Sequence, residues 1–414
     1  MDETIIRQLE KTKQAKKFML TCEKTKKEAA LTAIAAALKA NTDIIVAENE
    51  KDVAMAGQNG ISEAMVDRLL LTPERITAIA NDVLKVRDLP DPINEVIRVI
   101  ERPNGLVIKQ VRIPIGTVGV IYESRPNVTV DISAICIKTN NVAVLKGGKE
   151  ALNSNRILVK VINDAIKDIL GDGCVELIET SDRDQIARLM QANDYLDVII
   201  PRGSAALIQA VVKNASVPVI ETGAGICHLY IDSEADLTMA LEIALNGKVQ
   251  RPSVCNAIET ILVNEAVAEE FVPKLAKAFK PYNVTIYGDE RVQGLIDAKL
   301  ATAQNYATEY DDYICNIKTV KDVNEAIEHI YQYSTKHSEA IVTRNDATAE
   351  YFLSALDSAC VYHNASTRFS DGGEFGFGSE VGISTQKLHA RGPLGLQEMT
   401  SSKYKVYGKG QVRK

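Results

Sequence analysis

Hydrophobic and polar residues recur with two different periods along the chain, and the changes of period mark its regions. Residues 1–90 are rich in Ala, Lys, Glu and Leu, and Thr25–Lys39 repeats apolar residues at the spacing of one helix face. This pattern predicts a group of N-terminal helices. The joint Leu89-Pro90-Asp91-Pro92 is expected to end that group, because proline cannot continue a helix.

The following segment has the alternation of a β-hairpin. Two β-rich runs, Val96–Glu101 and Leu106–Val111, flank Asn104-Gly105, which is a strong hairpin signal. A long hairpin needs another element to cover it, and the alternating segment Lys403–Tyr407 is expected to supply an edge strand. We predict that residues 96–116 and 396–414 form a small β-hairpin extension for oligomerisation, and hence a homo-oligomer. The alternative is a hairpin that folds back on its own chain.

Two series of short apolar runs alternating with helical stretches fill the rest of the chain. The first series has expected strands and helices at Val118–Tyr122, Val142–Leu145, Ala151–Leu170, Val198–Ile200, Ser204–Asn214 and Val217–Ile220. The second has them at Thr260–Val263, Ala266–Phe279, Val284–Tyr287, Val323–Tyr333, Ala340–Thr343, Ala347–Leu356 and Cys360–His363. Such alternation is typical of parallel sheets covered by helices.

The predicted fold class is therefore α/β, with two domains that have parallel-sheet cores. The first domain is discontinuous, with residues 1–95 and 117–223, and residues 366–395 could complete it. The second domain comprises residues 224–365. The glycine-rich stretch Asp371–Gly378 is expected to be an irregular loop, either lining a site or serving only as a connection.

Composition narrows the class of protein. Hydrophobic residues make up 46% and charged residues 25%, with a net charge of −7 and both signs interspersed, so no nucleic-acid partner is expected. No apolar run approaches the length of a membrane span, and no membrane association is expected. Seven scattered cysteines without a C-x-x-C pair argue against a disulfide framework and a metal site. A reducing, cytoplasmic setting is the simplest interpretation.

The residues that carry chemistry lie in four segments and one cysteine. No G-x-G-x-x-G or P-loop follows a predicted strand, so a nucleotide would need another binding device. Four segments in order are Tyr122–Asn127, Val144–Glu150, Pro201–Ala206 and Ile220–Gly225, and Cys255 lies 34 residues after Glu221. Their order and spacing resemble the aldehyde dehydrogenase superfamily. There, a Pro-x-Asn motif, a cofactor lysine, a Gly-Ser turn and a Glu-x-Gly-Gly stretch precede the catalytic cysteine; here the first motif is shortened to Pro126-Asn127.

Three longer segments narrow the resemblance to one branch. Glu123–Thr129, Arg251–Asn256 and His389–Pro393 are similar to the γ-glutamyl phosphate reductase family, and the similarity runs to the final Gly408–Arg413. This resemblance implies an aldehyde-dehydrogenase-like fold and NADPH-dependent reduction of L-glutamate 5-phosphate to L-glutamate 5-semialdehyde and phosphate, in proline biosynthesis. It also suggests glutamate 5-kinase as a transient partner, because acyl phosphates hydrolyse in water.

The resemblance assigns three catalytic residues. Cys255 would attack the acyl phosphate and hold the acyl group as a thioester, which suits a thiolate. An isolated cysteine is more often a core residue, but Glu221 and the flanking Arg251–Asn256 favour catalysis. Asn127 would donate to the developing oxyanion together with the Cys255 backbone N–H; alternatively it is a turn residue. Glu221 would either shuttle a proton or shape the site, because an activated water would destroy the thioester. A thiolate needs a lowered pKa or a nearby cation, and Arg251 is a candidate contributor.

The resemblance also implies two sets of binding residues. Lys149 stands where NAD-using relatives often have a glutamate, and a cation there favours NADP; the alternative is a solvated lysine. The predicted cofactor-binding residues are Lys146, Lys149, Gly203, Ser204, Gly223 and Glu309. Arginine binds carboxylate and phosphate by paired hydrogen bonds, although any one arginine could instead form a surface salt bridge. The predicted substrate-binding residues are Arg125, Ser366, Thr367, Arg368, His389 and Arg391.

Two other functions stay open. A hydrolytic aldehyde dehydrogenase acting on another aldehyde would oxidise it without inorganic phosphate. A non-catalytic nucleotide-binding or scaffold protein would have an inert Cys255 thiol, whereas an enzyme of this kind would have a thiol that reacts rapidly and that substrate protects.

Overall fold

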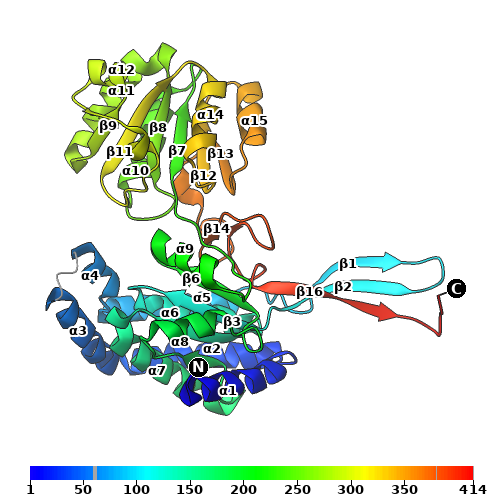
Figure 1. Cartoon of the computed structure of the whole chain (residues 1–414). Coiled ribbons are helices and arrows are strands. Elements are labelled where there is room, and N and C mark those ends of the chain that lie inside the picture. Colours follow the sequence, from blue (N-terminus) through cyan, green and yellow to red (C-terminus); the bar gives the residue numbers. More distant parts are fainter. Residues whose placement is uncertain (59–62, 379, 414) are drawn as a thin grey trace. The chain divides into compact units, whose positions relative to one another are not determined.

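The computed structural model describes residues 1–58, 63–378 and 380–413, and its chain separates into two compact units (Figure 1). Unit 1 comprises Met1–Thr222, Gly376–Gly382 and Leu394–Lys414, and unit 2 comprises Gly223–Phe375 and Ile383–Pro393. These bounds differ from the expected division mainly in residues 366–375 and 383–393, which fall in unit 2 instead of completing the first domain. Which unit binds cofactor and which carries catalysis stays a prediction.

The N-terminal region of unit 1 is helical, as predicted. Its helices are α1 (Glu3–Met19), α2 (Lys24–Ala40), α3 (Thr42–Gln58), α4 (Glu63–Leu69) and α5 (Pro73–Asp88). Side chains of Asp2 and Thr72 accept hydrogen bonds from backbone N–H groups in the first turns of α1 and α5, which stabilises both helix starts. Helix α2 packs against α5 and α7 (Leu152–Leu170).

The core of unit 1 is a four-stranded parallel sheet with the order β5-β4-β3-β6. Its strands are β3 (Thr117–Tyr122), β4 (Val142–Gly147), β5 (Val175–Leu177) and β6 (Val198–Arg202). Every residue of β3 and β4 is buried, as expected for a sheet covered on both faces. One face packs against α1 and α9 (Ala205–Asn214) in a cluster that includes Ile5, Leu9, Ile121, Val144, Ile199 and Val211. Helices α6 (Pro126–Lys138) and α8 (Arg183–Met190) complete this region.

One predicted strand of unit 1 is wrong. Val217–Ile220 forms only an isolated bridge, Ile199 to Val219. The Ile199 N–H donates to the Pro218 carbonyl and the Ile220 N–H donates to the Ile199 carbonyl, but Pro218 has no N–H with which to extend the ladder. Strand β5 was not predicted, because it has only three residues and one of them is Glu176.

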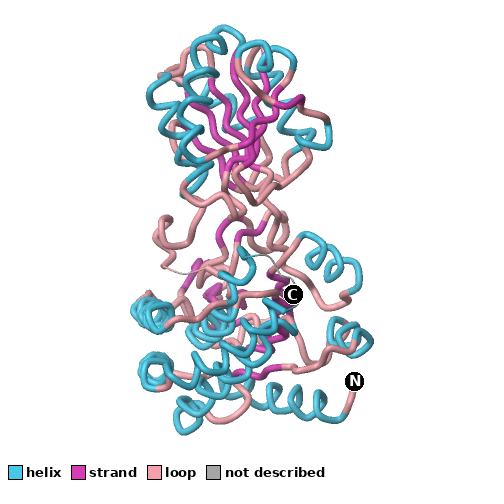
Figure 2. Tube along the Cα trace, turned by 90° about the vertical axis from the view of Figure 1, so that its left-hand side faces the viewer, coloured by secondary structure: helices cyan, strands magenta, loops and turns pink. Residues whose placement is uncertain are grey.

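The core of unit 2 is a seven-stranded parallel sheet with the order β10-β9-β11-β8-β7-β12-β13. Figure 2 shows these strands side by side, with helices around them. Its strands are β7 (Cys227–Ile231), β8 (Ile258–Asn264), β9 (Thr285–Gly288), β10 (Lys299–Leu300), β11 (Ile314–Val320), β12 (Ser338–Val342) and β13 (Cys360–His363). Its α-helices are α10 (Leu237–Val249), α11 (Glu265–Phe279), α12 (Glu290–Leu295), α13 (Ala303–Tyr306), α14 (Val323–Tyr333) and α15 (Asp346–Ala355).

Alternate residues of these strands enter two separate cores. Leu229 and Ile231 pack with Phe271 of α11, whereas Tyr230 packs with Phe352 of α15. Strand residues point alternately to opposite faces, so this division shows helices covering both sides of the sheet. The two parallel sheets confirm the predicted α/β class.

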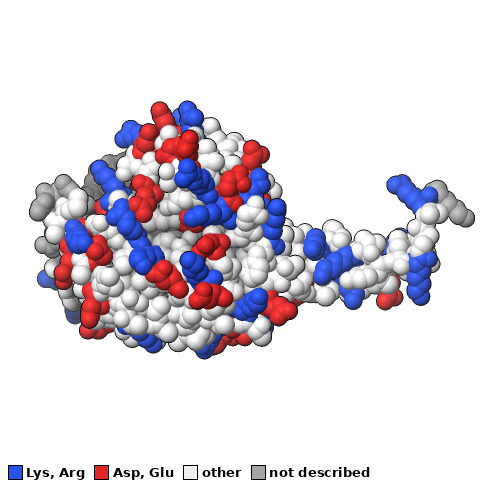
Figure 3. All heavy atoms as spheres, turned by 90° about the horizontal axis from the view of Figure 1, so that it is seen from below, with Lys and Arg blue, Asp and Glu red and all other residues white. Residues whose placement is uncertain are grey.

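The predicted hairpin is also confirmed. Strands β1 (Val96–Glu101) and β2 (Val107–Pro114) are antiparallel, and β16 (Thr400–Tyr407) pairs with β2 along its whole length. This three-stranded sheet projects from the rest of unit 1 and carries basic side chains among uncharged ones (Figure 3). Its outer strands β1 and β16 expose apolar side chains, including Val99 and Val406. A two-stranded sheet, β14 (Ile383–Ser384) and β15 (Gly392–Pro393), belongs to unit 2.

Among the described residues, no single helix combines the length and apolar character needed for a membrane span. One bent pair, α2 with α3 at 70°, meets those two criteria only when taken together.

Candidate functional site

The predicted site residues divide between the two units. Unit 1 contains Arg125, Asn127, Lys146, Lys149, Gly203, Ser204 and Glu221. Unit 2 contains Gly223, Cys255, Glu309, Ser366, Thr367, Arg368, His389 and Arg391.

Cys255 differs from the other cysteines in its exposure. All seven cysteines lie in the described part of the chain, and none of them is in a disulfide. Six are buried, whereas Cys255 is partly exposed in the loop between α10 and β8. Buried cysteines behave as small apolar residues, so exposure singles out Cys255 as the cysteine that could meet a substrate.

The backbone of Cys255 is held against Gly225. A Cβ atom at Gly225 would lie 1.4 Å from the Cys255 carbonyl oxygen, so only glycine fits there. The Gly225 N–H donates to Glu309 Oε1 at 2.6 Å, and the Cys227 thiol donates to the Cys255 carbonyl at 3.2 Å. Three segments far apart in sequence therefore meet at the amino ends of β7, β8 and β11. This contact brings the predicted cofactor residue Glu309 close to the loop of Cys255.

The neighbouring Asn256 fixes the other side of this loop. Its Nδ2 donates to the Ser370 carbonyl at 2.9 Å, and its own carbonyl accepts from Thr367 Oγ1 at 2.7 Å. Arg368 donates to Asn256 Oδ1 and, at 3.0 Å, to Gln250 Oε1. The predicted residues Thr367 and Arg368 are thus in the immediate surroundings of Cys255. The Thr367 hydroxyl is buried and holds the loop, a task the sequence did not suggest.

Two arginines influence the charge around Cys255. Burial, and then the charge of Arg251, lower the pKa of the Arg368 guanidinium, while the charge of Cys255 raises it. A guanidinium near a thiol favours the thiolate. Arg251 is the cation predicted from the sequence, and Arg368 is a second cation whose charge interacts with Cys255.

Arg391 and His389 have different surroundings. Arg391 donates to Asp357 Oδ1 at 2.9 Å and to the Asp357 carbonyl at 2.8 Å. Hydrogen bonds from Lys387 and Arg391 hold the pKa of Asp357 well below its usual range. His389 is exposed and has a left-handed backbone, with φ of 69°. The Arg391 guanidinium is already bound to Asp357. Substrate binding by Arg391 and by His389 therefore stays a prediction.

In unit 1, the predicted residues from Arg125 to Ser204 gather at the carboxyl ends of β3, β4 and β6, where ligands of parallel sheets commonly bind. The turn between β3 and α6 has Ser124 in a left-handed conformation, with φ of 43°. Glu150 Oε1 accepts from the Ser124 N–H at 2.7 Å and from its hydroxyl at 2.9 Å. Glu150 therefore fixes this turn. No role for it was predicted, although it lies in one of the four segments.

Asn127 is held in place by a carboxylate one helical turn later. Its Nδ2 donates to Asp131 Oδ2 at 2.9 Å. Burial raises the pKa of Asp131 to about 7, and the Asn127 hydrogen bond acts in the opposite direction. The second N–H of the Asn127 amide is not used in this bond. The arrangement fixes the rotamer of a residue for which an oxyanion role is predicted.

The two predicted lysines line a small cavity at the ends of β4 and β5. The cavity has a volume of about 10 Å³ and is bounded by Lys146, Gly147, Lys149 and the loop from Ile178 to Ser181, among others. Burial lowers the pKa of Lys146, whose ammonium donates to the Gly147 carbonyl at 2.6 Å. Lys149 is exposed.

Gly203 and Ser204 open helix α9, as predicted. The Ser204 hydroxyl caps the helix by accepting from the Leu207 N–H. The Ser204 N–H donates to Glu123 Oε2 at 2.8 Å, and a Cβ at Gly203 would lie 2.5 Å from the same oxygen. A helix start is a natural place for an anion, and here a side-chain carboxylate takes that place.

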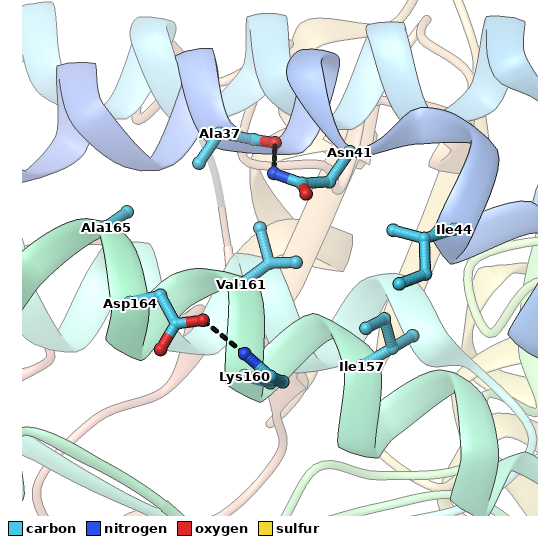
Figure 4. Close-up of a pocket in the computed structure, with 8 residues that line it drawn as sticks. All are labelled: Ala37, Asn41, Ile44, Ile157, Lys160, Val161, Asp164 and Ala165. Carbon is cyan, nitrogen blue, oxygen red and sulfur yellow. Dashed lines mark hydrogen bonds and ion pairs between the residues drawn. The ribbon is translucent and has the colours of Figure 1, made fainter.

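A larger cavity in unit 1 contains none of the predicted residues. It has a volume of about 270 Å³ and lies between the α2–α3 junction and α7 (Figure 4). Its lining is largely apolar, with one ion pair between Lys160 and Asp164 at 2.5 Å and a hydrogen bond from Asn41 to the Ala37 carbonyl. Groups of three or more His, Cys, Asp or Glu side chains suited to a metal ion are absent from the residues that the structure describes.

Comparison with known proteins agrees with the resemblance seen in the sequence. A model of the aldehyde dehydrogenase family matches residues 2–302. γ-Glutamyl phosphate reductase of Clostridium perfringens (strain ATCC 13124) is 52% identical over 415 residues, covering 100% of both chains. The protein of that name from Moorella thermoacetica is 51% identical, covering 98% of this chain and 97% of its own.

Solved structures give the same result. The crystal structure of γ-glutamyl phosphate reductase from Thermotoga maritima has a TM-score of 0.97 at 44% identity and covers 100% of both chains. An acetylating aldehyde dehydrogenase from Geobacillus thermoglucosidasius has a TM-score of 0.71 at 17% identity and shares the fold. The predicted family and fold are confirmed.

Replacing Gly225 with alanine should disturb the loop of Cys255. The added methyl group would meet a backbone carbonyl, so the loop must shift, at a cost of roughly 1 to 3 kcal/mol. Thermal unfolding should show lower stability, and mass spectrometry should show a changed rate of Cys255 alkylation by iodoacetamide. Gly294→Ala is the control, because its Cβ would enter open space. Equal thermal stability and equal Cys255 alkylation rates in the two variants would contradict the inferred contact between Gly225 and the loop of Cys255.

Asp131 should make stability depend on pH. Its raised folded-state pKa means that the folded chain keeps a proton which the unfolded chain loses above about pH 4. Stability is therefore lost as pH rises from about 4 to 7. The free energy of unfolding of Asp131→Asn, relative to that of the parent, should rise by roughly 1 to 2 kcal/mol from pH 5 to pH 8. Chemical denaturation measures this difference. Exposed Asp164→Asn should show no such trend, and a pH-independent difference for Asp131→Asn would refute the assignment.

Proposed function

The chain belongs to the γ-glutamyl phosphate reductase family of the aldehyde dehydrogenases, and on this premise we propose that it reduces L-glutamate 5-phosphate to L-glutamate 5-semialdehyde in proline biosynthesis. It is an oxidoreductase of that family. The observation that carries the proposal is the 52% identity to a protein named for this reaction over 100% of both chains. The held, partly exposed Cys255 supplies the chemistry that such a reaction requires.

We propose Cys255 as the nucleophile. Its thiolate attacks the γ-carbonyl carbon, the bond from that carbon to the phosphate oxygen breaks, and phosphate leaves with the electron pair. The product is a thioester on Sγ. After reduction, the thiohemiacetal oxygen re-forms the carbonyl and expels the thiolate, which releases the semialdehyde. Arg368 and Arg251 stabilise the thiolate before its attack and again after its expulsion, because a cation lowers the free energy of a nearby anion.

The backbone N–H of Cys255 and the side chain of Asn127 are the proposed donors to the oxyanion. Each such donor typically contributes on the order of 10²- to 10³-fold to rate. The Asp131 hydrogen bond supports the role of Asn127, since a fixed amide costs no reorganisation when charge develops.

NADP is the proposed cofactor, and the residues at the carboxyl edge of the unit 1 sheet fit it chemically. The exposed ammonium of Lys149 and the hydroxyls of Thr180 and Ser181 suit a phosphate-bearing ribose. When bound, NADPH supplies the hydride that reduces the thioester carbon. Gly203, Ser204, Gly223, Glu309 and Lys146 are the other proposed cofactor residues. An engineered glycolyl-CoA reductase of the same fold, 16% identical, binds NADP⁺.

Glu221 and the substrate-binding residues complete the proposal. Glu221 is half-buried and directly precedes Thr222, whose hydroxyl donates to the Pro201 carbonyl at 2.6 Å. We propose that it transfers a proton or shapes the site, because water activation would destroy the thioester. Arg125, Ser366, Thr367, Arg368, His389 and Arg391 remain the proposed substrate contacts, with Arg368 best placed by its proximity to Cys255.

Cys255→Ala should abolish the reaction. With L-glutamate 5-semialdehyde, NADP and inorganic phosphate, the parent should produce NADPH, whose absorbance measures the rate. Loss of the nucleophile should lower this rate by about 10⁴-fold or more. Cys22→Ala, at a buried cysteine of unit 1, is the control and should keep its activity. Activity retained in Cys255→Ala would exclude the thioester, and oxidation that needs no phosphate would favour the hydrolytic alternative.

We also propose a homo-oligomer assembled through the three-stranded sheet. Its support is the exposed apolar surface of β1 and β16, where Val99, Tyr404 and Val406 are each at least 50% exposed. Strands at the edge of a sheet also present backbone groups that can pair with another chain.

A charge on this surface should dissociate the oligomer. Val406→Asp should shift the mass measured by analytical ultracentrifugation toward that of one chain of 45.2 kDa, because a charge buried at an interface is costly. Met55→Asp is a matched control, since Met55 is 56% exposed and Val406 is 57% exposed. An unchanged mass for Val406→Asp would count against this surface as the interface.

A further inference from the structure

Asn155 on helix α7 carries a buried hydrogen-bond donor that the fold does not use. The residue is 1% exposed, and its Nδ2 has no hydrogen-bond partner among the described residues. It lines the cavity at the ends of β4 and β5, together with Lys146 and Lys149. Buried polar groups are nearly always paired, and an unpaired one costs stability. This amide therefore calls for a function.

The orientation of the amide follows from its other atom. Asn155 Oδ1 accepts from Thr129 Oγ1 at 2.9 Å, and Thr129 Oγ1 lies 2.6 Å from the Tyr122 hydroxyl. Burial raises the pKa of Tyr122, so the phenol keeps its proton and donates to Thr129. Thr129 in turn donates to Oδ1. With Oδ1 committed as an acceptor, Nδ2 is the atom of the amide that is left without a partner among the described residues.

Gly147 makes room for this atom. A Cβ at Gly147 would lie 2.1 Å from Asn155 Nδ2. Any other residue at the end of β4 would therefore displace the amide. The cavity, at about 10 Å³, has room for one water-sized group but not for a nucleobase. That is enough space for a single oxygen-bearing group of a larger molecule that lies outside.

We propose that Asn155 is a cofactor-binding residue, which donates Nδ2–H to a ribose oxygen of the dinucleotide beside Lys149. The proposal rests on the cofactor assigned under the proposed function and adds a binding residue to it. An acceptor oxygen suits the amide N–H, and the neighbouring ammonium of Lys149 suits a phosphate on the same ribose.

The test is the equilibrium dissociation constant of NADPH, measured by fluorescence titration without any turnover. Asn155→Asp keeps an acceptor for Thr129 but puts a carboxylate where the donor stood, so NADPH should bind at least about 10-fold more weakly. Asn163→Asp on the same helix is the matched control. Its Nδ2 donates to the Val175 carbonyl at 2.9 Å, so its change should lower stability without altering the NADPH dissociation constant.

A second variant keeps the test decisive if the buried charge prevents folding. Asn155→Leu adds no charge, although the loss of the Oδ1 acceptor for Thr129 should lower its melting temperature, and NADPH binding should weaken in the folded variant. Unchanged NADPH affinity in a folded Asn155 variant overturns the proposal, as does equal weakening in Asn163→Asp, and the cavity would then hold only water. Failure of the proposed function itself is distinguishable, because the parent chain would then bind no NADPH in the same titration.

Discussion

The contact between the α-carbon of Gly225 and the carbonyl of Cys255 is the constraint on which the unit 2 site depends. The carbonyl oxygen of Cys255 can approach the Gly225 backbone this closely only because glycine has no side chain. This close packing fixes the two loops relative to each other. The same glycine offers its N–H to Glu309, and the same carbonyl accepts from the Cys227 thiol. One small residue thereby fixes the main chain of Cys255, the proposed nucleophile.

Carboxylates play the corresponding part at the sheet edge of unit 1. Glu150 holds the turn after β3, Glu123 holds the start of α9, and Asp131 holds Asn127. In each case the acid accepts hydrogen bonds from groups near the predicted cofactor and oxyanion residues. An anionic ligand that arrived at the α9 start would meet Glu123 before it met the helix. The electrostatics of this edge are therefore set as much by acids as by the two lysines.

Sequence patterns predicted most of this architecture, and the exceptions have physical causes. The period of apolar residues identified α7 and α11, and Asn-Gly identified the hairpin. Val217–Ile220 looked like a strand because three of its four residues are β-branched, but Pro218 interrupts the pairing. The site residues came from motif order, which identified Cys255 but gave no role to Asn256 or Glu150. The roles of Asn256 and Glu150 depend on hydrogen bonds to residues 26 to 114 positions away along the chain. Contacts over such sequence separations leave no local sequence pattern.

The pairing of β2 with β16 has a consequence for the order in which the chain can fold during synthesis. Val107–Pro114 must wait for Thr400–Tyr407, which follows it far along the chain. All of unit 2 is made in the interval, because it is inserted between the parts of unit 1. Contacts of such large sequence separation form late, since the entropy of closing a long loop opposes them. The edge of β2 that β16 covers therefore stays unpaired in the nascent chain while unit 2 is made, and the hairpin needs protection from aggregation during that interval.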